Sequence, residues 1–100
     1  MIARIWHGIT PAEKANEYLE FLQKRAIPDY ERVNGCLKIT ILHRIEEEIA
    51  HFETLTFWTS EEAIKKFAGS EVLKAKYYPE DQDFLLEFEE HVRHYKVTKK

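Results

Sequence analysis

Histidine and tyrosine are the side chains of this chain that could transfer or hold a proton near neutral pH. His7 lies in a short apolar run near the N-terminus. An imidazole titrates close to the physiological range, so His7 is a candidate general base. The alternative is a structural role, because a lone histidine is often partly buried and bonded to a backbone carbonyl or an acid.

Five aromatic side chains could line a pocket for a planar ligand. They are Tyr18, Trp58, Phe67, Tyr77 and Tyr78. Rings supply apolar contact area, and tyrosine hydroxyls add hydrogen-bonding groups. The same spacing on helices and strands is typical of core residues, and it favours a core role for Trp58 and Phe67. Tyr77 and Tyr78 precede the helix-breaking Pro79 and are the stronger pocket candidates, because loops on a rigid scaffold often carry function.

The other titratable residues do not predict a metal site. His91 and His94 are three residues apart on an expected strand, so their side chains point to opposite faces. His43 and His51 lie on expected neighbouring strands, but two histidines without a third ligand make a weak metal site. The acids of residues 80–90 lack the spacing of a calcium loop and are expected to form a solvated surface. We therefore expect neither a metal nor a cofactor.

The composition is that of a folded protein, and we expect one domain over residues 1–100. Hydrophobic residues make up 44% of the chain and charged residues 33%, and the net charge is -3. A negative charge argues against nucleic acid as a partner, because phosphate binding needs a basic patch. The single Cys36 cannot form an internal disulfide, and residues 1–8 are expected to form a strand and lack the long apolar run of a signal peptide or membrane span. We therefore expect a cytoplasmic protein with no membrane partner.

Alternation and capping signals predict the element order β-α-β-β-α-β. The expected strands are 2–8, 36–45, 49–58 and 91–97. Thr10 and Pro11 supply an N-cap and a first-position proline for the first main helix. Thr59 and Glu62 supply a capping box for the second main helix, and Gly69 ends it.

This order predicts an α+β fold, the ferredoxin-like βαββαβ plait. Right-handed crossovers place the third strand beside the first, in a four-stranded antiparallel sheet with both main helices on one face. Residues 51–58 carry large apolar side chains on both faces, whereas a small antiparallel sheet normally leaves one face to water. The helices can cover one face, and we expect a second copy of the chain to cover the other.

Residues 56–78 resemble the antibiotic-biosynthesis-monooxygenase-like members of the dimeric α/β-barrel superfamily, and the resemblance covers essentially the whole chain. The residues that carry it are Trp58, Ser60, Glu62, Ala63, Phe67, Ser70, Lys74 and Ala75. Members typically form dimers whose sheets pack bare face to bare face, and each protomer keeps a pocket between its helices and its sheet. Their activities include cofactor-free oxidation of aromatic polyketides, quinol oxidation and haem degradation. Some members have no known activity.

The haem-degrading members allow a comparison at single positions. They use an asparagine on the first strand, a tryptophan late in the second main helix and a histidine on the following turn. The corresponding places in this chain hold His7, Phe67 and Tyr77. All three differ, so the resemblance does not imply haem degradation, although it still implies the pocket.

The resemblance also assigns the two faces of the first strand. It implies that His7 looks toward the helices and shares one pocket with the tyrosines near Pro79. Arg4 and Trp6 would then lie on the opposite face as dimer residues, with Glu53 as a partner for Arg4.

Two functions follow from the resemblance. The first is a cofactor-independent monooxygenase-like homodimer that acts on a small aromatic or quinol-type molecule, with His7 as the base. The second is a non-catalytic, small-molecule-binding or stress-associated dimer with the same pocket.

Overall fold

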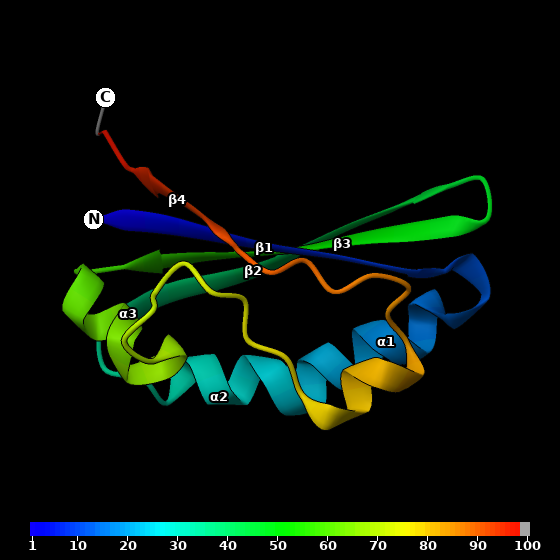
Figure 1. Ribbon diagram of the computed structural model, residues 1–100, viewed down its shortest axis with the longest axis horizontal. Coiled ribbons are helices and arrows are strands. Elements are labelled where there is room, and N and C mark those ends of the chain that lie inside the picture. Colours follow the sequence, from blue (N-terminus) through cyan, green and yellow to red (C-terminus); the bar gives the residue numbers. More distant parts are fainter. Residues whose placement is uncertain (99–100) are drawn as a thin grey trace.

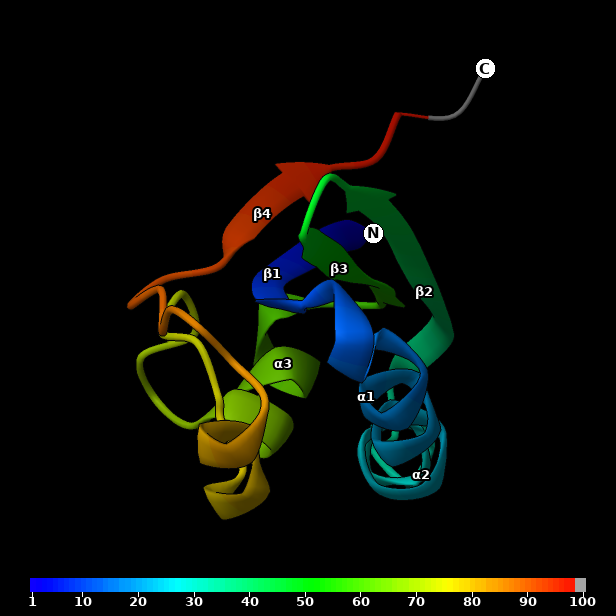
Figure 2. The same ribbon diagram turned by 90° about the vertical axis from the view of Figure 1, so that its right-hand side faces the viewer.

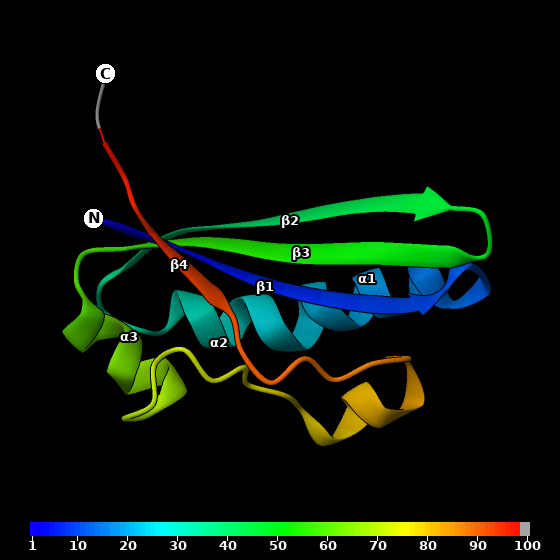
Figure 3. The same cartoon turned by 45° about the horizontal axis from the view of Figure 1, so that its top comes forward.

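The computed structural model describes residues 1–98, which form a curved four-stranded sheet with helices on one face (Figure 1). The strands are β1 (Ile2–Pro11), β2 (Cys36–Glu46), β3 (Ile49–Trp58) and β4 (Arg93–Lys96). All neighbours are antiparallel and the order is β2-β3-β1-β4, so the expected place of the third strand beside the first is confirmed. Figure 3 shows that β4 is much shorter than the other strands and crosses one end of β1.

The helical layer consists of short segments. These are η1 (Ala12–Lys14), α1 (Ala15–Phe21), the π-helical turn η2 (Leu22–Ala26), α2 (Ile27–Glu31), α3 (Glu61–Ala68) and the 3-10 turn η3 (Pro79–Asp83). The π-helical turn ends two residues before Pro28, which has no backbone N–H with which to continue the regular hydrogen-bond pattern. In Figure 2 all of these segments lie on the same side of the sheet, and the other face of the sheet carries no helix.

Two predicted helix starts are wrong. Thr10 does not cap the first helix, because β1 continues through it and pairs with β3 as far as Pro11 opposite Ile49. The Ala12 amide donates to the Glu48 carbonyl oxygen at 2.8 Å, so backbone pairing replaces the cap. The N-cap of α3 is Ser60 and not Thr59, and its hydroxyl accepts from the Ala63 amide at 3.2 Å.

Gly69 ends α3 with a φ of 89°, as the sequence predicts. The following residues as far as Tyr78 form no regular helix or strand, and their backbone is tied to the rest of the fold at a few points. The Ala75 amide donates to the Glu90 carbonyl oxygen at 2.9 Å, and the Val92 amide donates to the Leu73 carbonyl oxygen at 2.7 Å. We call residues 69–78 the connecting segment.

The two faces of β1 are the reverse of what the resemblance led us to expect. Trp6 is 5% exposed within the core under the helices, and Arg4 is 1% exposed on the same face. These side chains lie opposite Thr54 and Thr56 of β3, whose small size leaves room for large neighbours. His7 therefore belongs to the sheet face that no helix covers, which we call the open face. The placement of Arg4 and Trp6 as dimer residues is wrong for the same reason.

Candidate functional site

His7 is held by a carboxylate at the outer edge of β1. Its Nδ1 lies 2.5 Å from Glu89 Oε2, and the two side chains remain 29% and 40% exposed. A carboxylate only accepts hydrogen bonds, so this contact assigns the proton of neutral His7 to Nδ1 and leaves Nε2 as an acceptor. Glu89 can reach His7 because β4 pairs with β1 only from Ile2 to Ile5, which leaves the edge beyond Ile5 to the preceding residues.

A second histidine continues this contact across the open face. His51 Nδ1 lies 3.2 Å from His7 Nε2, and the two rings stack with their centroids 5.5 Å apart. His51 Nε2 lies 3.6 Å from Glu46 Oε1. The four side chains form a line from Glu89 to Glu46, in which His51 pairs with Glu46 as an ion only when its ring is protonated. Sequence analysis missed both carboxylates, since Glu89 is 82 positions from His7 and no local spacing signals the contact.

The five aromatic candidates lie on the other side of the sheet from His7. Tyr18, Trp58 and Phe67 are core residues that are 1%, 0% and 8% exposed, whereas Tyr77 and Tyr78 are partly buried against this core. The structure therefore brings the aromatic side chains together with one another but places the His7 ring across the sheet. In this closed arrangement the rings fill the space between helices and sheet.

A buried carboxylate joins the tyrosines. Asp81 is 2% exposed, and it accepts from the Tyr18 hydroxyl at 2.8 Å and from the Tyr78 amide at 2.6 Å. Burial raises the pKa of Asp81, while these two donors act in the opposite direction. The Tyr78 hydroxyl donates in turn to Asp29 Oδ2 at 2.7 Å, which ties the end of the connecting segment to α2.

The phenols in this region are donors at neutral pH. Burial, followed by the nearby Glu89, raises the pKa of Tyr77 to about 12. Burial and the Asp81 carboxylate raise the pKa of Tyr18, and burial and Asp29 raise that of Tyr78. Each hydroxyl therefore keeps its proton, which suits the stabilisation of an anion and not the abstraction of a proton.

Glu89 is the residue through which the two sides of the sheet meet. Its carboxylate contacts His7 on the open face, and its backbone carbonyl accepts from the Tyr77 hydroxyl at 2.5 Å. The Tyr77 ring also meets Trp6 edge to face, with centroids 6.0 Å apart. The prediction that His7 and the tyrosines share one helix-facing side is wrong, but His7 and Tyr77 are bound to the same residue.

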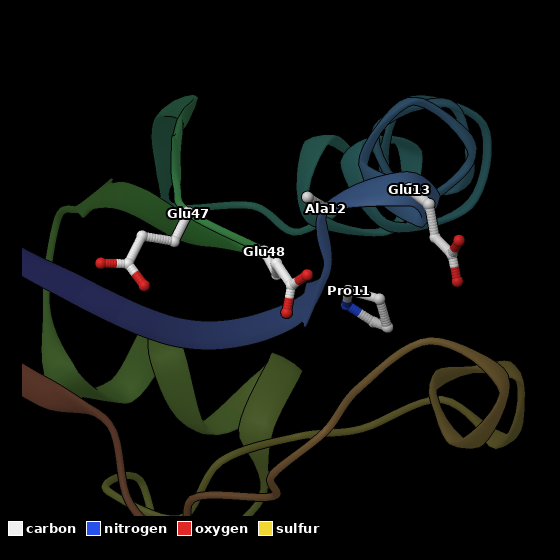
Figure 4. Close-up of a pocket in the computed structure, with 5 residues that line it drawn as sticks. All are labelled: Pro11, Ala12, Glu13, Glu47 and Glu48. Atoms are coloured by element: carbon white, nitrogen blue, oxygen red, sulfur yellow. The ribbon is translucent and has the colours of Figure 1, made fainter.

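A hollow of about 480 Å³ lies where the end of β1 meets the connection between β2 and β3 (Figure 4). Its lining residues are Pro11, Ala12, Glu13, Glu47 and Glu48. The three carboxylates point in different directions in Figure 4, and the hollow contains none of the site residues predicted from the sequence. In residues 1–98 no group of three histidine, cysteine, aspartate or glutamate side chains is placed to hold a metal ion. No helix of that part of the chain is long and apolar enough to span a membrane.

Comparison with known families gives one match. Residues 1–76 match the model of the antibiotic biosynthesis monooxygenase family. No curated protein matches the sequence of this chain.

Several solved structures are similar in fold. A Bacillus cereus protein provisionally named an antibiotic biosynthesis monooxygenase is 20% identical with a TM-score of 0.64, and the match covers 99% of this chain and 92% of that protein. A mutant of MhuD, with two manganese protoporphyrin IX molecules in each active site, is 18% identical with a TM-score of 0.63, covering 100% of this chain and 97% of MhuD. A conserved protein from Methanosarcina mazei Go1 is 17% identical with a TM-score of 0.59, covering 98% and 94%. At these identities the likeness shows a common fold.

Proposed function

Because the chain belongs to the antibiotic biosynthesis monooxygenase family, we propose that it is a homodimeric, cofactor-independent monooxygenase-like enzyme acting on a small aromatic or quinol-type substrate. In such a reaction a base takes a proton from the substrate, and the substrate anion gives electrons to dioxygen. When a methylene is oxidised, one oxygen atom becomes a carbonyl, and the other leaves as water with the two methylene hydrogens. The protein must supply a base, donors for the anion and a site that excludes water.

The contact between His7 and Glu89 is the observation that carries this proposal. The carboxylate fixes the ring and its tautomer, so that Nε2 is the proton acceptor. A substrate hydroxyl or acidic C–H would take the place of His51 Nδ1, which lies 3.2 Å from this nitrogen. After the transfer, the positive imidazolium lies 2.5 Å from Glu89, which stabilises its charge. His51 lies next along the same line and can exchange a proton with His7 Nε2.

We assign the substrate to the edge of β1, where His7 and Tyr77 meet Glu89 from the two sides. Tyr77 and Tyr78 would contact the substrate and donate to its anion, because their phenols remain protonated. Tyr18, Trp58 and Phe67 would form the apolar wall behind them. The connecting segment must shift for a planar molecule to reach this wall.

The proposed dimer forms through the open face. Ile5 lies between Leu55 of β3 and Arg93 of β4, and Leu42 and Phe57 extend this apolar surface across β2 and β3. Leu42 is 46% exposed in the single chain. A second copy packed on this face would remove these side chains from water, and an obligate pair of this kind buries about 1,600 Å² or more.

Porphyrin is not part of the proposal, although MhuD binds a manganese porphyrin. Phe67, one of the three residues that differ from the haem-degrading members, stacks on Tyr30 with ring centroids 4.2 Å apart. Two cationic side chains also contact its ring, Arg4 at 5.7 Å and Lys76 at 4.2 Å from the centroid. A large macrocycle would have to displace this packed cluster.

Oxygen uptake with an anthrone and with a quinol tests the proposed activity. We expect His7→Ala to lower turnover by roughly 10²-fold, the usual effect of a lost general base, while the melting temperature changes little because the ring is partly exposed. His91→Ala is the matched control, since His91 is exposed, and it should keep full turnover. Glu89→Gln should shift the pH profile of turnover, because Glu89 acts through His7.

Equal activity of His7→Ala and the unmodified protein would remove His7 as the base. Unfolding of His7→Ala would show that the histidine is structural.

The non-catalytic dimer is the second candidate, and the closed interior favours it. Tyr18 and Trp58 are at most 1% exposed, so no open pocket reaches the predicted aromatic residues in this conformation. This candidate predicts no oxygen uptake with either substrate. Native mass spectrometry of the purified protein would instead detect a dimer mass with a retained small molecule.

A further inference from the structure

Arg4 is a buried charge without an acidic partner in residues 1–98. Its side chain is 1% exposed, and its Nη2 donates to the Lys74 carbonyl oxygen at 3.2 Å. Its Nε is buried and has no hydrogen-bond partner. A guanidinium carries five N–H donors and keeps its charge. The Tyr30 side chain also hydrogen-bonds to Arg4, but its phenol keeps its proton and supplies no negative charge, because burial raises its pKa to about 12. Burying a guanidinium without a carboxylate is unfavourable by several kcal/mol, so the position calls for an explanation beyond packing.

A second unpartnered nitrogen lies beside Arg4. His94 faces Arg4 across the β1 and β4 pairing, and its Nε2 is also buried without a partner. Burial and then the positive charge of Arg4 lower the pKa of His94, while Glu61 is the acid that acts in the opposite direction. Lys76 adds a third basic group, because its Nζ lies over the Phe67 ring that Arg4 also contacts. Basic nitrogens on two strands and the connecting segment thus lie in one region, and Glu61 is the acid that acts on His94 there.

A hollow lies beside His94. It has a volume of about 390 Å³, and His94 is one of its lining residues. Ile2, Val72 and Leu73 give it apolar walls, and Lys96 and Glu61 also line it. Val72 and Leu73 belong to the connecting segment, which is the yellow-green trace between α3 and η3 in Figure 1. Arg4 does not line the hollow itself, but it is paired with His94 across β1 and β4 and is two residues from Ile2 along β1.

We propose that Arg4, His94 and this hollow form a binding site for a small organic carboxylate. The carboxylate accepts from Arg4 Nε and from His94 Nε2, while the apolar part of the ligand lies against Ile2, Val72 and Leu73. Arginine suits this ligand, because the planar guanidinium edge matches the two oxygens of a carboxylate. An inorganic anion would satisfy the charges but leave the apolar walls in contact with water.

This site does not depend on the proposed oxidation. His7 lies on the open face, whereas Arg4 and His94 lie on the helix-facing side of the same sheet. A protein without oxygenase activity could still bind the carboxylate, so binding is measured directly and not through turnover.

Calorimetric and NMR titration with benzoate tests the proposal. We expect saturable binding of benzoate and no binding of benzamide, which has the same shape without the charge. Arg4→Met should weaken benzoate binding by at least about tenfold, which corresponds to about 1.4 kcal/mol. Arg93→Met is the matched control, because it removes the same charge from an exposed position on the other face of β4, and it should change the affinity less than about twofold.

Three results would overturn the proposal. The first is the absence of saturable benzoate binding at about 10 mM, a concentration well above a millimolar dissociation constant. The second is an affinity of Arg4→Met for benzoate equal to that of the unmodified protein. The third is sulfate binding that displaces benzoate with equal affinity. The last result would identify a site for inorganic anions.

If Arg4→Met does not fold, the unmodified protein and His94→Gln decide the question. Benzoate must then move the Arg4 Nε–H resonance of the unmodified protein, and His94→Gln must weaken the binding. An Arg4 resonance that is insensitive to benzoate contradicts the site.

Discussion

Removing the hydroxyl of Tyr18 should destabilise the protein strongly at neutral pH and weakly in acid. The hydroxyl donates to Asp81 Oδ1 at 2.8 Å, and the two residues are 1% and 2% exposed. Tyr18→Phe leaves the buried carboxylate with one fewer donor, and a hydrogen bond to a charged group contributes about 1.5–3 kcal/mol. In a domain of this size, the loss at neutral pH corresponds to a fall in melting temperature of roughly 10 °C.

The pH dependence follows from the raised pKa of folded Asp81. Asp81 keeps its proton to a higher pH in the folded state than in the unfolded state. Protonated Asp81 therefore favours folding below the unfolded pKa of 3.8, and this contribution to stability is lost as the pH rises through the folded pKa. Tyr18→Phe removes a group that lowers this pKa, so the folded pKa of the variant rises further. Relative to the unmodified protein, the variant therefore loses little free energy of unfolding at a pH where Asp81 is protonated in both proteins. It loses most where Asp81 is ionised.

Urea unfolding followed by tryptophan fluorescence at about pH 4 and about pH 7 measures this difference. Tyr95→Phe is the control, because Tyr95 is 50% exposed and its hydroxyl is free to contact water. The control should lie within about 0.5 kcal/mol of the unmodified protein. Two results for Tyr18→Phe would refute the stabilising role of the Tyr18–Asp81 hydrogen bond. One is an equal loss of the free energy of unfolding at both pH values, and the other is a loss below about 0.5 kcal/mol at neutral pH.

Three further outcomes are expected. Leu55→Asp places a charge in the centre of the open face and should give a folded monomer by light scattering and circular dichroism. The control Leu86→Asp, at a position that is 52% exposed, should leave the dimer intact. A dimeric Leu55→Asp would argue against this interface. Gly35→Ala should lower the free energy of unfolding in urea by about 2–4 kcal/mol, since φ is 104° and a methyl group there would collide with Ala63. Gly69→Ala should lower the free energy of unfolding by less, because φ is 89° there but the space around the residue is open. Haemin titration should give weak absorbance changes and no reductant-driven loss of the Soret band, and stoichiometric cleavage to an open tetrapyrrole would contradict the reasoning from His7, Phe67 and Tyr77.

The order of elements could be predicted from the sequence because its signals are local. Alternation in residues 49–58 and the acidic connection before them predict the hairpin, and β2 and β3 pair in that way. Gly69 likewise marks the end of α3. The predicted start of the first helix was wrong because the cap signal at Thr10 competes with the pairing of β1 and β3, and that pairing depends on the partner strand.

The candidate site was harder to predict, because alternation gives two possible orientations of a strand and does not say which face is covered. Trp6 and Arg4 are large enough to belong to a core or to an interface. The small Thr54 and Thr56 opposite them were the signal that could have placed them under the helices. Glu89, Glu46 and Asp81 reach their partners through tertiary contacts, which are not visible in any short stretch of sequence.

The sparse backbone pairing of the connecting segment has a consequence for the rate of ligand entry. The central strands β1 and β3 pair with each other over their whole lengths, so the amides bonded between these two strands exchange with solvent only when the entire domain opens. The connecting segment is tied by single bonds such as that from Arg4 to the Lys74 carbonyl oxygen, and its amides exchange through local opening. Val72 and Leu73 of this segment line the hollow beside His94, so a carboxylate that binds there enters through the local opening. Its association rate should therefore be insensitive to mutations that change only the global stability of the sheet.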